Sequence, residues 1–156
     1  MLKIPVILTL SVLLSLPSFA DWQFTKWGAS PREVSDASGR QAQPLTEEIA
    51  GSKSRGNRLA LLSMPYRSGQ FDFTATFLFT RGTNLSEVDL KLDSESDPYA
   101  LKRALRQKYG TPTREIDPSG DAEWIVGADR ILLSSIAGKH WQLIYESVDA
   151  RDLNGL

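Results

Sequence analysis

Alternation of hydrophobic and polar residues is clearest over 71–80 (FDFTATFLFT), where Phe71, Phe73, Ala75, Phe77 and Phe79 share one face. A period of two predicts a half-buried β-strand. The same pattern, less regular, predicts further strands at 58–64, 87–92, 122–126, 130–136 and 140–147, and a short one at 22–28. Residues 40–56 hold few bulky apolar side chains, so we expect a long loop there with at most one weak turn of structure.

Two segments begin and end with residues typical of helices. In 30–39, serine, proline and glutamate stand at the N-cap, first and third helical positions, and glycine follows the end. In 97–110, aspartate and proline open a segment with an apolar stripe at helical spacing, and glycine closes it. Both segments are predicted to be helices.

The predicted elements follow one order twice, a helix and then three strands, over 30–92 and 97–147. A helix on three strands leaves apolar surface open, which joining two such units would bury. We therefore expect one α+β domain over 21–147, an antiparallel sheet of two helix–three-strand units with both helices on one face. Residues 148–156 are expected to be a frayed tail.

The first 20 residues, MLKIPVILTLSVLLSLPSFA, have the build of a secretory signal peptide: one positive charge, an apolar run and small residues before a cut. Cleavage is expected between Ala20 and Asp21. The alternative, a membrane helix, needs about 20 apolar residues, and this run is shorter. No cysteine is present for lipid attachment. We expect a periplasmic or secreted bacterial protein with no stable membrane anchor.

Two stretches, KWGASPREVSDASG (26–39) and ALRQKYGTP (104–112), resemble helix starts and ends in small exported bacterial α+β domains. Similar units of a helix and a strand meander occur in tandem in beta-lactamase inhibitory proteins. One such unit occurs in the small lipoprotein of the barrel-assembly machinery. The resemblance implies an architecture, while the cysteines of both families are missing here; fold by itself does not give function.

The sequence offers little for catalysis. It has no cysteine and one histidine, His140, too few for a zinc cluster or a conventional hydrolytic triad. Residues 93–97 alternate oxygen-bearing side chains but lack the remaining features of a calcium loop, so a solvated loop with a helix cap is expected. Asp121, Glu123 and Glu146 are candidates for a paired-carboxylate hydrolase. No cofactor, metal or catalytic residue is predicted.

Binding suits the chain better. Its 18 basic and 19 acidic residues give no surplus for nucleic acid. A basic loop at 51–58 and the aromatics, some expected on the uncovered sheet face, could meet a partner. The candidate partner-binding residues are Trp27, Lys53, Arg55, Tyr66, Trp141 and Tyr145.

We therefore expect a non-catalytic module that binds another envelope or periplasmic protein, as an inhibitor, an immunity protein or an envelope-assembly accessory. Two alternatives stay open. One is a cell-wall hydrolase that uses paired carboxylates. The other is a carrier of a small ligand or lipid, which would be favoured if the sheet curls around an apolar cavity.

Overall fold

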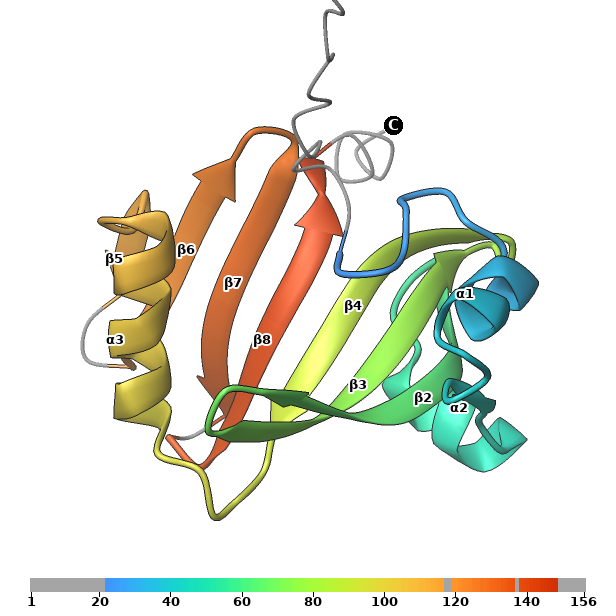
Figure 1. Ribbon diagram of the computed structural model, residues 1–156, viewed down its shortest axis with the longest axis horizontal. Coiled ribbons are helices and arrows are strands. Elements are labelled where there is room, and N and C mark those ends of the chain that lie inside the picture. The colour runs from blue at the N-terminus through green and yellow to red at the C-terminus, as the bar shows by residue number, and fades with distance from the viewer. Residues whose placement is uncertain (1–21, 117–118, 137, 149–156) are drawn as a thin grey trace, which may run out of the picture.

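The computed structural model describes residues 22–116, 119–136 and 138–148, which form an α+β fold around one antiparallel sheet (Figure 1). The helices are α1 (Pro31–Ala37), α2 (Glu47–Lys53) and α3 (Pro98–Tyr109). The strands are β1 (Gln43–Pro44), β2 (Arg58–Ser68), β3 (Phe71–Thr80), β4 (Asn84–Leu92), β5 (Arg114–Ile116), β6 (Asp121–Val126), β7 (Asp129–Ile136) and β8 (His140–Ser147). The α+β class and the antiparallel sheet are as the sequence predicts.

The eight strands lie in the order β1-β2-β3-β4-β8-β7-β6-β5. β4 and β8 pair at the centre, with Val88 opposite Tyr145 and Leu90 opposite Leu143. Both edge strands are short, which limits the unpaired backbone that an edge presents to other chains. β1 pairs with only two residues of β2, and Pro65 lies beyond that contact, at an edge position that tolerates proline.

The core lies on one face of the sheet, here called the inner face. Strand side chains such as Phe77, Val88 and Leu133 are fully buried there. Val34 of α1 and Leu101 of α3 belong to the same hydrophobic cluster. Both helices lie in front of this face in Figure 1. The opposite, outer face carries the alternate residues of each strand, most of them polar or charged.

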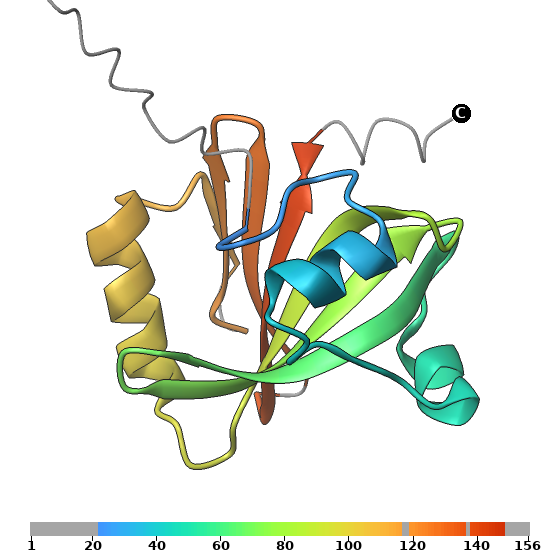
Figure 2. The ribbon, with the colours of Figure 1, turned by 45° about the vertical axis from the view of Figure 1, so that its right-hand side comes forward.

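The first half of the sheet is strongly bent. The register shifts between Ala60 and Leu62 in β2 and again at the β3–β4 pairing, and such bulges bend a sheet. A two-residue loop joins β2 to β3; its first residue, Gly69, has φ +59°, a conformation that costs glycine little. The hairpin reaches across toward α3 in both views (Figures 1 and 2).

The helix boundaries agree with the predicted caps. Ser30 and Glu33 form a capping box at α1, with the Ser30 backbone N–H donating to Glu33 Oε2 at 2.7 Å. The Asp97 side chain accepts from the Tyr99 N–H at 2.8 Å, and Gly110 ends α3. The local sequence therefore determines where both helices begin and end.

Several local predictions are wrong. Residues 22–28 form turns and not the predicted strand, since the Thr25 N–H donates to the carbonyl of Trp22, three residues earlier, within the same segment. Residues 40–56 are not a long loop: they hold β1 and α2, whose N-cap is Thr46. β2 continues through Pro65 to Ser68, and the short strand β5 was not expected.

Candidate functional site

An apolar cavity of about 230 Å³ lies between α3, the bent β2–β3 hairpin and the inner face of the sheet. Its walls are mainly leucine and aromatic side chains. The lining residues are Trp22, Gln23, Tyr66, Ser68, Gly69, Phe71, Phe73, Leu90, Leu101, Ala104, Leu105, Lys108, Leu143 and Tyr145. The exposed ones, Gln23, Ser68, Gly69 and Lys108, mark its mouth.

Trp22 forms one wall of the cavity through a set of aromatic contacts. Its ring lies 5.0 Å from that of Tyr66 and 5.6 Å from that of Phe77, both edge to face. It is also 6.5 Å from the ring of Tyr145. These contacts bury Trp22 to 3% exposure, although its segment has no regular secondary structure. The inner aromatics thus hold the N-terminal segment against the sheet.

The polar groups of the cavity are few. Tyr145 is linked to Tyr109 through their hydroxyls, 3.4 Å apart. Burial, with a further contribution from Tyr109, raises the pKa of Tyr145 well above its ordinary value, so this hydroxyl is neutral at physiological pH. Lys108 is the one charged residue among the described lining residues. The cavity can therefore accept an apolar group while offering polar contacts at particular points.

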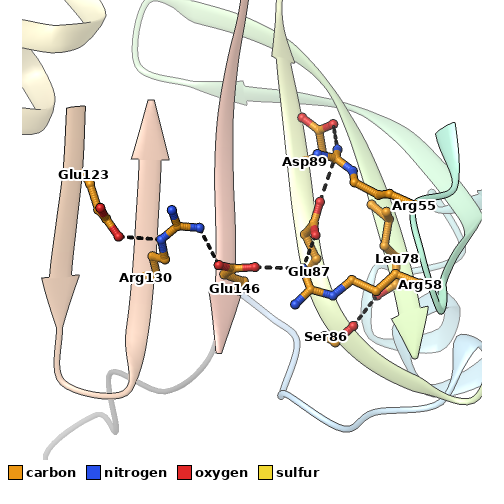
Figure 3. A network of polar contacts seen from close by, with 9 residues as sticks. All are labelled: Arg55, Arg58, Leu78, Ser86, Glu87, Asp89, Glu123, Arg130 and Glu146. Carbon is orange, nitrogen blue, oxygen red and sulfur yellow. Dashed lines mark hydrogen bonds and ion pairs between the residues drawn. The ribbon is translucent and has the colours of Figure 1, made fainter. Parts of the chain in front are cut away.

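A charged strip crosses the outer face (Figure 3). It consists of alternating basic and acidic side chains from the α2–β2 connection to β5. Its members are Arg55, Asp89, Glu87, Arg58, Glu146, Arg130, Glu123 and Arg114.

The centre of the charged strip is Glu146, which uses both of its carboxylate oxygens. Oε2 accepts from Arg58 Nη1 at 2.7 Å, and Oε1 accepts from Arg130 Nη1 at 2.6 Å. Arg58 also pairs with Glu87, while Arg130 Nε lies 2.5 Å from Glu123 Oε1. The strip therefore joins β2 and β4 to β8, β7 and β6.

Two carboxyl groups at one end of the charged strip are held in a desolvated setting. Burial raises the pKa of Glu87 and of Asp89, although Arg55 pulls both pKa values in the opposite direction. Arg55 Nη2 lies 2.7 Å from Asp89 Oδ2 and 3.2 Å from Glu87 Oε1. In Glu146, by contrast, burial would raise the pKa, but hydrogen bonds from Arg58 and Arg130 hold it below its ordinary value.

The predicted aromatic site residues do not lie on the outer face, so the expectation of aromatics there is wrong. Tyr66, Trp141 and Tyr145 alternate with the outward-facing residues of β2 and β8 and join the inner cluster. Trp27 also packs against that cluster and donates from Nε1 to Asp129 Oδ1 at 2.7 Å. In the second half of the sheet, apolar side chains are buried on the inner face because α3 covers that face.

The remaining predicted residues lie in different parts of the fold. Lys53 ends α2, and Arg55 follows it as part of the charged strip. Tyr66 and Tyr145 both line the cavity, while Trp27, Lys53 and Arg55 do not. The proposed cleavage residues Ala20 and Asp21 lie outside the described residues.

The carboxylates that were candidates for a hydrolase accept hydrogen bonds from other residues of the sheet. Asp121 Oδ1 accepts from the Ser135 N–H at 2.9 Å, and Glu123 and Glu146 both bind Arg130. His140 is exposed and lines a separate hollow of about 360 Å³ near the β7–β8 turn. Among the described residues, no group of three or more histidines or carboxylates could hold a metal ion.

Sequence reasoning missed the buried carboxylate Glu87, the half-buried carboxylate Asp89 and the cavity itself. The carboxylates had a detectable signal, because they alternate with Val88 and Leu90 and so share the outer face of a central strand. The cavity had none, since its walls come together from the N-terminal segment, a hairpin and a helix distant in sequence.

Comparisons with protein-family models, curated proteins and solved structures find no match to this chain. Within the described residues, no helix is long and apolar enough to cross a membrane.

Proposed function

We propose that this chain is a non-catalytic binding protein that holds a small apolar ligand in the cavity beneath α3. One observation carries the proposal: a space of about 230 Å³ with mainly leucine and aromatic walls, roofed by a hairpin that bends toward a helix. This is the carrier alternative of the sequence analysis, which depended on a sheet that curls around an apolar cavity.

The volume sets the size of the ligand. A dry apolar cavity of about 150 Å³ can hold benzene, so by proportion this one holds about nine non-hydrogen atoms. Protein interiors are otherwise closely packed, so an apolar ligand held here would gain contacts that the cavity walls lack without it. An eight-carbon chain is a ligand of the right size.

Calorimetric titration of the full chain with 1-octanol tests the proposal. We expect one site with a dissociation constant on the order of 0.1 mM, from about 0.6 kcal/mol per non-hydrogen atom. Trp22 fluorescence should change on binding, because this ring lines the cavity. Ala104→Leu would fill part of the space and weaken binding.

Ala50→Leu is the matched control. Ala50 is also half-buried on a helix, but it lies on α2 and does not line the cavity. Octanol should bind this variant as it binds the wild type. Absence of octanol binding to the folded wild type, or equal binding to both variants, would contradict the proposal.

Three sequence-based predictions accompany this proposal. Export by a cleaved leader and an envelope protein as partner both stay predictions. We also propose that 30–92 and 97–147 are tandem units, as the resemblance to beta-lactamase inhibitory proteins implies. The strand order supports this: β2-β3-β4 is followed by β8-β7-β6, so the last strand of each half lies at the centre.

A further inference from the structure

We infer that the ligand of the cavity is an anionic amphiphile, a single chain of about eight carbons with a carboxylate head that Lys108 binds at the mouth. The inference rests on the proposed function and adds the chemical class of the ligand. It depends on the charges around α3 and on the position of Lys108 among the lining residues.

Lys108 differs from the other basic residues of α3. Lys102 and Arg106 both pair with Glu115, the latter at 2.5 Å, and Arg103 Nη2 lies 3.7 Å from Asp97 Oδ2. Lys108 pairs with no carboxylate within the described part of the chain. Among the basic residues of α3, it is thus the one that has no carboxylate partner in the described part of the chain.

The surroundings of Lys108 place its charge beside the apolar space. It lies one turn after Ala104 and Leu105, which line the cavity wall, and it lines the cavity itself. Its Nζ lies 4.9 Å from the centre of the Tyr109 ring, a cation–π contact that restrains the flexible side chain. A head group bound here would leave the chain directed toward Leu101 and Leu143.

Two further features bear on an anion held by Lys108. Tyr145 lines the cavity, and its hydroxyl, 3.4 Å from that of Tyr109, adds no negative charge because it does not ionise at physiological pH. The carbonyls at the end of a helix repel anions, but that of Gly110 accepts from Trp124 Nε1 at 3.0 Å and is partly neutralised. A carboxylate at Lys108 would therefore meet a cation, with no ionised tyrosine in the cavity to repel it.

The test compares three ligands that share one chain: octanoate, 1-octanol and octylamine, titrated calorimetrically into the full chain at pH 7.5. We expect octanoate to bind about fivefold more tightly than octanol, the gain of a partly exposed ion pair, and octylamine to bind least. Added salt should weaken the binding of octanoate and leave the binding of octanol unchanged. Lys108→Gln should abolish the preference for octanoate, and Lys108→Arg should retain it.

Lys26→Gln is the control, because Lys26 is exposed and does not line this cavity. If octanoate and octanol bind with equal affinity, and Lys108→Gln changes neither affinity, the inference of an anionic head group is wrong. The proposed function, binding of an apolar ligand, would be unaffected. Failure of all three ligands to bind would overturn the proposed function itself. Flotation with anionic phospholipid vesicles separates a membrane source: binding to vesicles without binding to octanoate would also overturn the inference.

Discussion

Replacing Arg58 with methionine should reveal how much the charged strip contributes to stability. The Arg58 side chain is 11% exposed and pairs with Glu87 and Glu146, whose side chains are 2% and 6% exposed. Methionine retains much of the aliphatic volume and removes the charge. The substitution therefore leaves two buried carboxylates with one fewer cation.

The structure gives the expected size of this effect. Removing one partner of a buried ion pair typically costs about 3–5 kcal/mol, because the other charge stays buried. Here Glu146 keeps Arg130 at 2.6 Å, and Glu87 keeps Arg55 at 3.2 Å. The remaining cations place the expected loss near the lower value, about 3 kcal/mol at pH 7.

The loss should shrink as the pH falls. Loss of Arg58 removes a cation that lowers both pKa values: that of Glu87, already raised by burial, rises further, and that of Glu146, held below its ordinary value in the wild type, rises from there. The folded variant therefore binds more protons than the folded wild type as the pH falls, and the difference in stability between the two narrows. Protonation removes the buried charges that the substitution leaves uncompensated.

Urea unfolding, followed by circular dichroism at pH 7 and pH 5, measures both effects. Arg32→Met is the matched control: the Arg32 side chain is 92% exposed and lies 3.8 Å from Asp36, so its loss should hardly matter. The double variant Arg58→Met with Glu87→Gln should recover part of the loss, since it removes one buried charge. A loss below about 0.5 kcal/mol, or one equal at both pH values, would refute this reasoning.

Three other substitutions test separate parts of the fold. Leu105→Ala would enlarge the cavity and lower the unfolding free energy by about 2–4 kcal/mol in urea titration, since Leu105 is 5% exposed. Trp27→Phe removes the hydrogen bond to Asp129 and should cost about 1.5–3 kcal/mol in the same assay. Asp89→Asn should remove one contribution to the pH dependence of stability: burial raises the Asp89 pKa, so the contribution of this group falls as the pH rises from the unfolded pKa of about 3.9, and unfolding midpoints measured across pH for wild type and variant test it.

The parts of the fold that sequence predicts are those in which neighbouring residues determine the structure. Ser30 and Glu33 form their capping box across three positions, and the aromatic alternation in β3 needs only the strand itself. The sequence did not predict α2, because this helix buries none of its side chains and so has no apolar stripe. Its cap Thr46 and the acidic residues 47–48 were available as signals.

The parts that sequence does not predict depend on contacts between distant residues. Trp22 lies in a turn, and its burial comes from Tyr66 and Phe77, more than 40 positions away. The charged strip depends on strand register: Arg58 and Glu146 are 88 positions apart and meet only because β4 pairs with β8. A shift of one residue would turn these charges into the core.

The charged strip and the cavity lie on opposite faces, yet both depend on how the two halves of the sheet are joined. One wall of the cavity is the β2–β3 hairpin, and the facing wall is α3, which precedes the strands of the second half. The angle between these walls is therefore set at the β4–β8 pairing. Glu146 lies there and binds Arg58 from one half and Arg130 from the other. The ion pairs on the outer face therefore add to the apolar contacts of the inner cluster in holding the two halves at that angle.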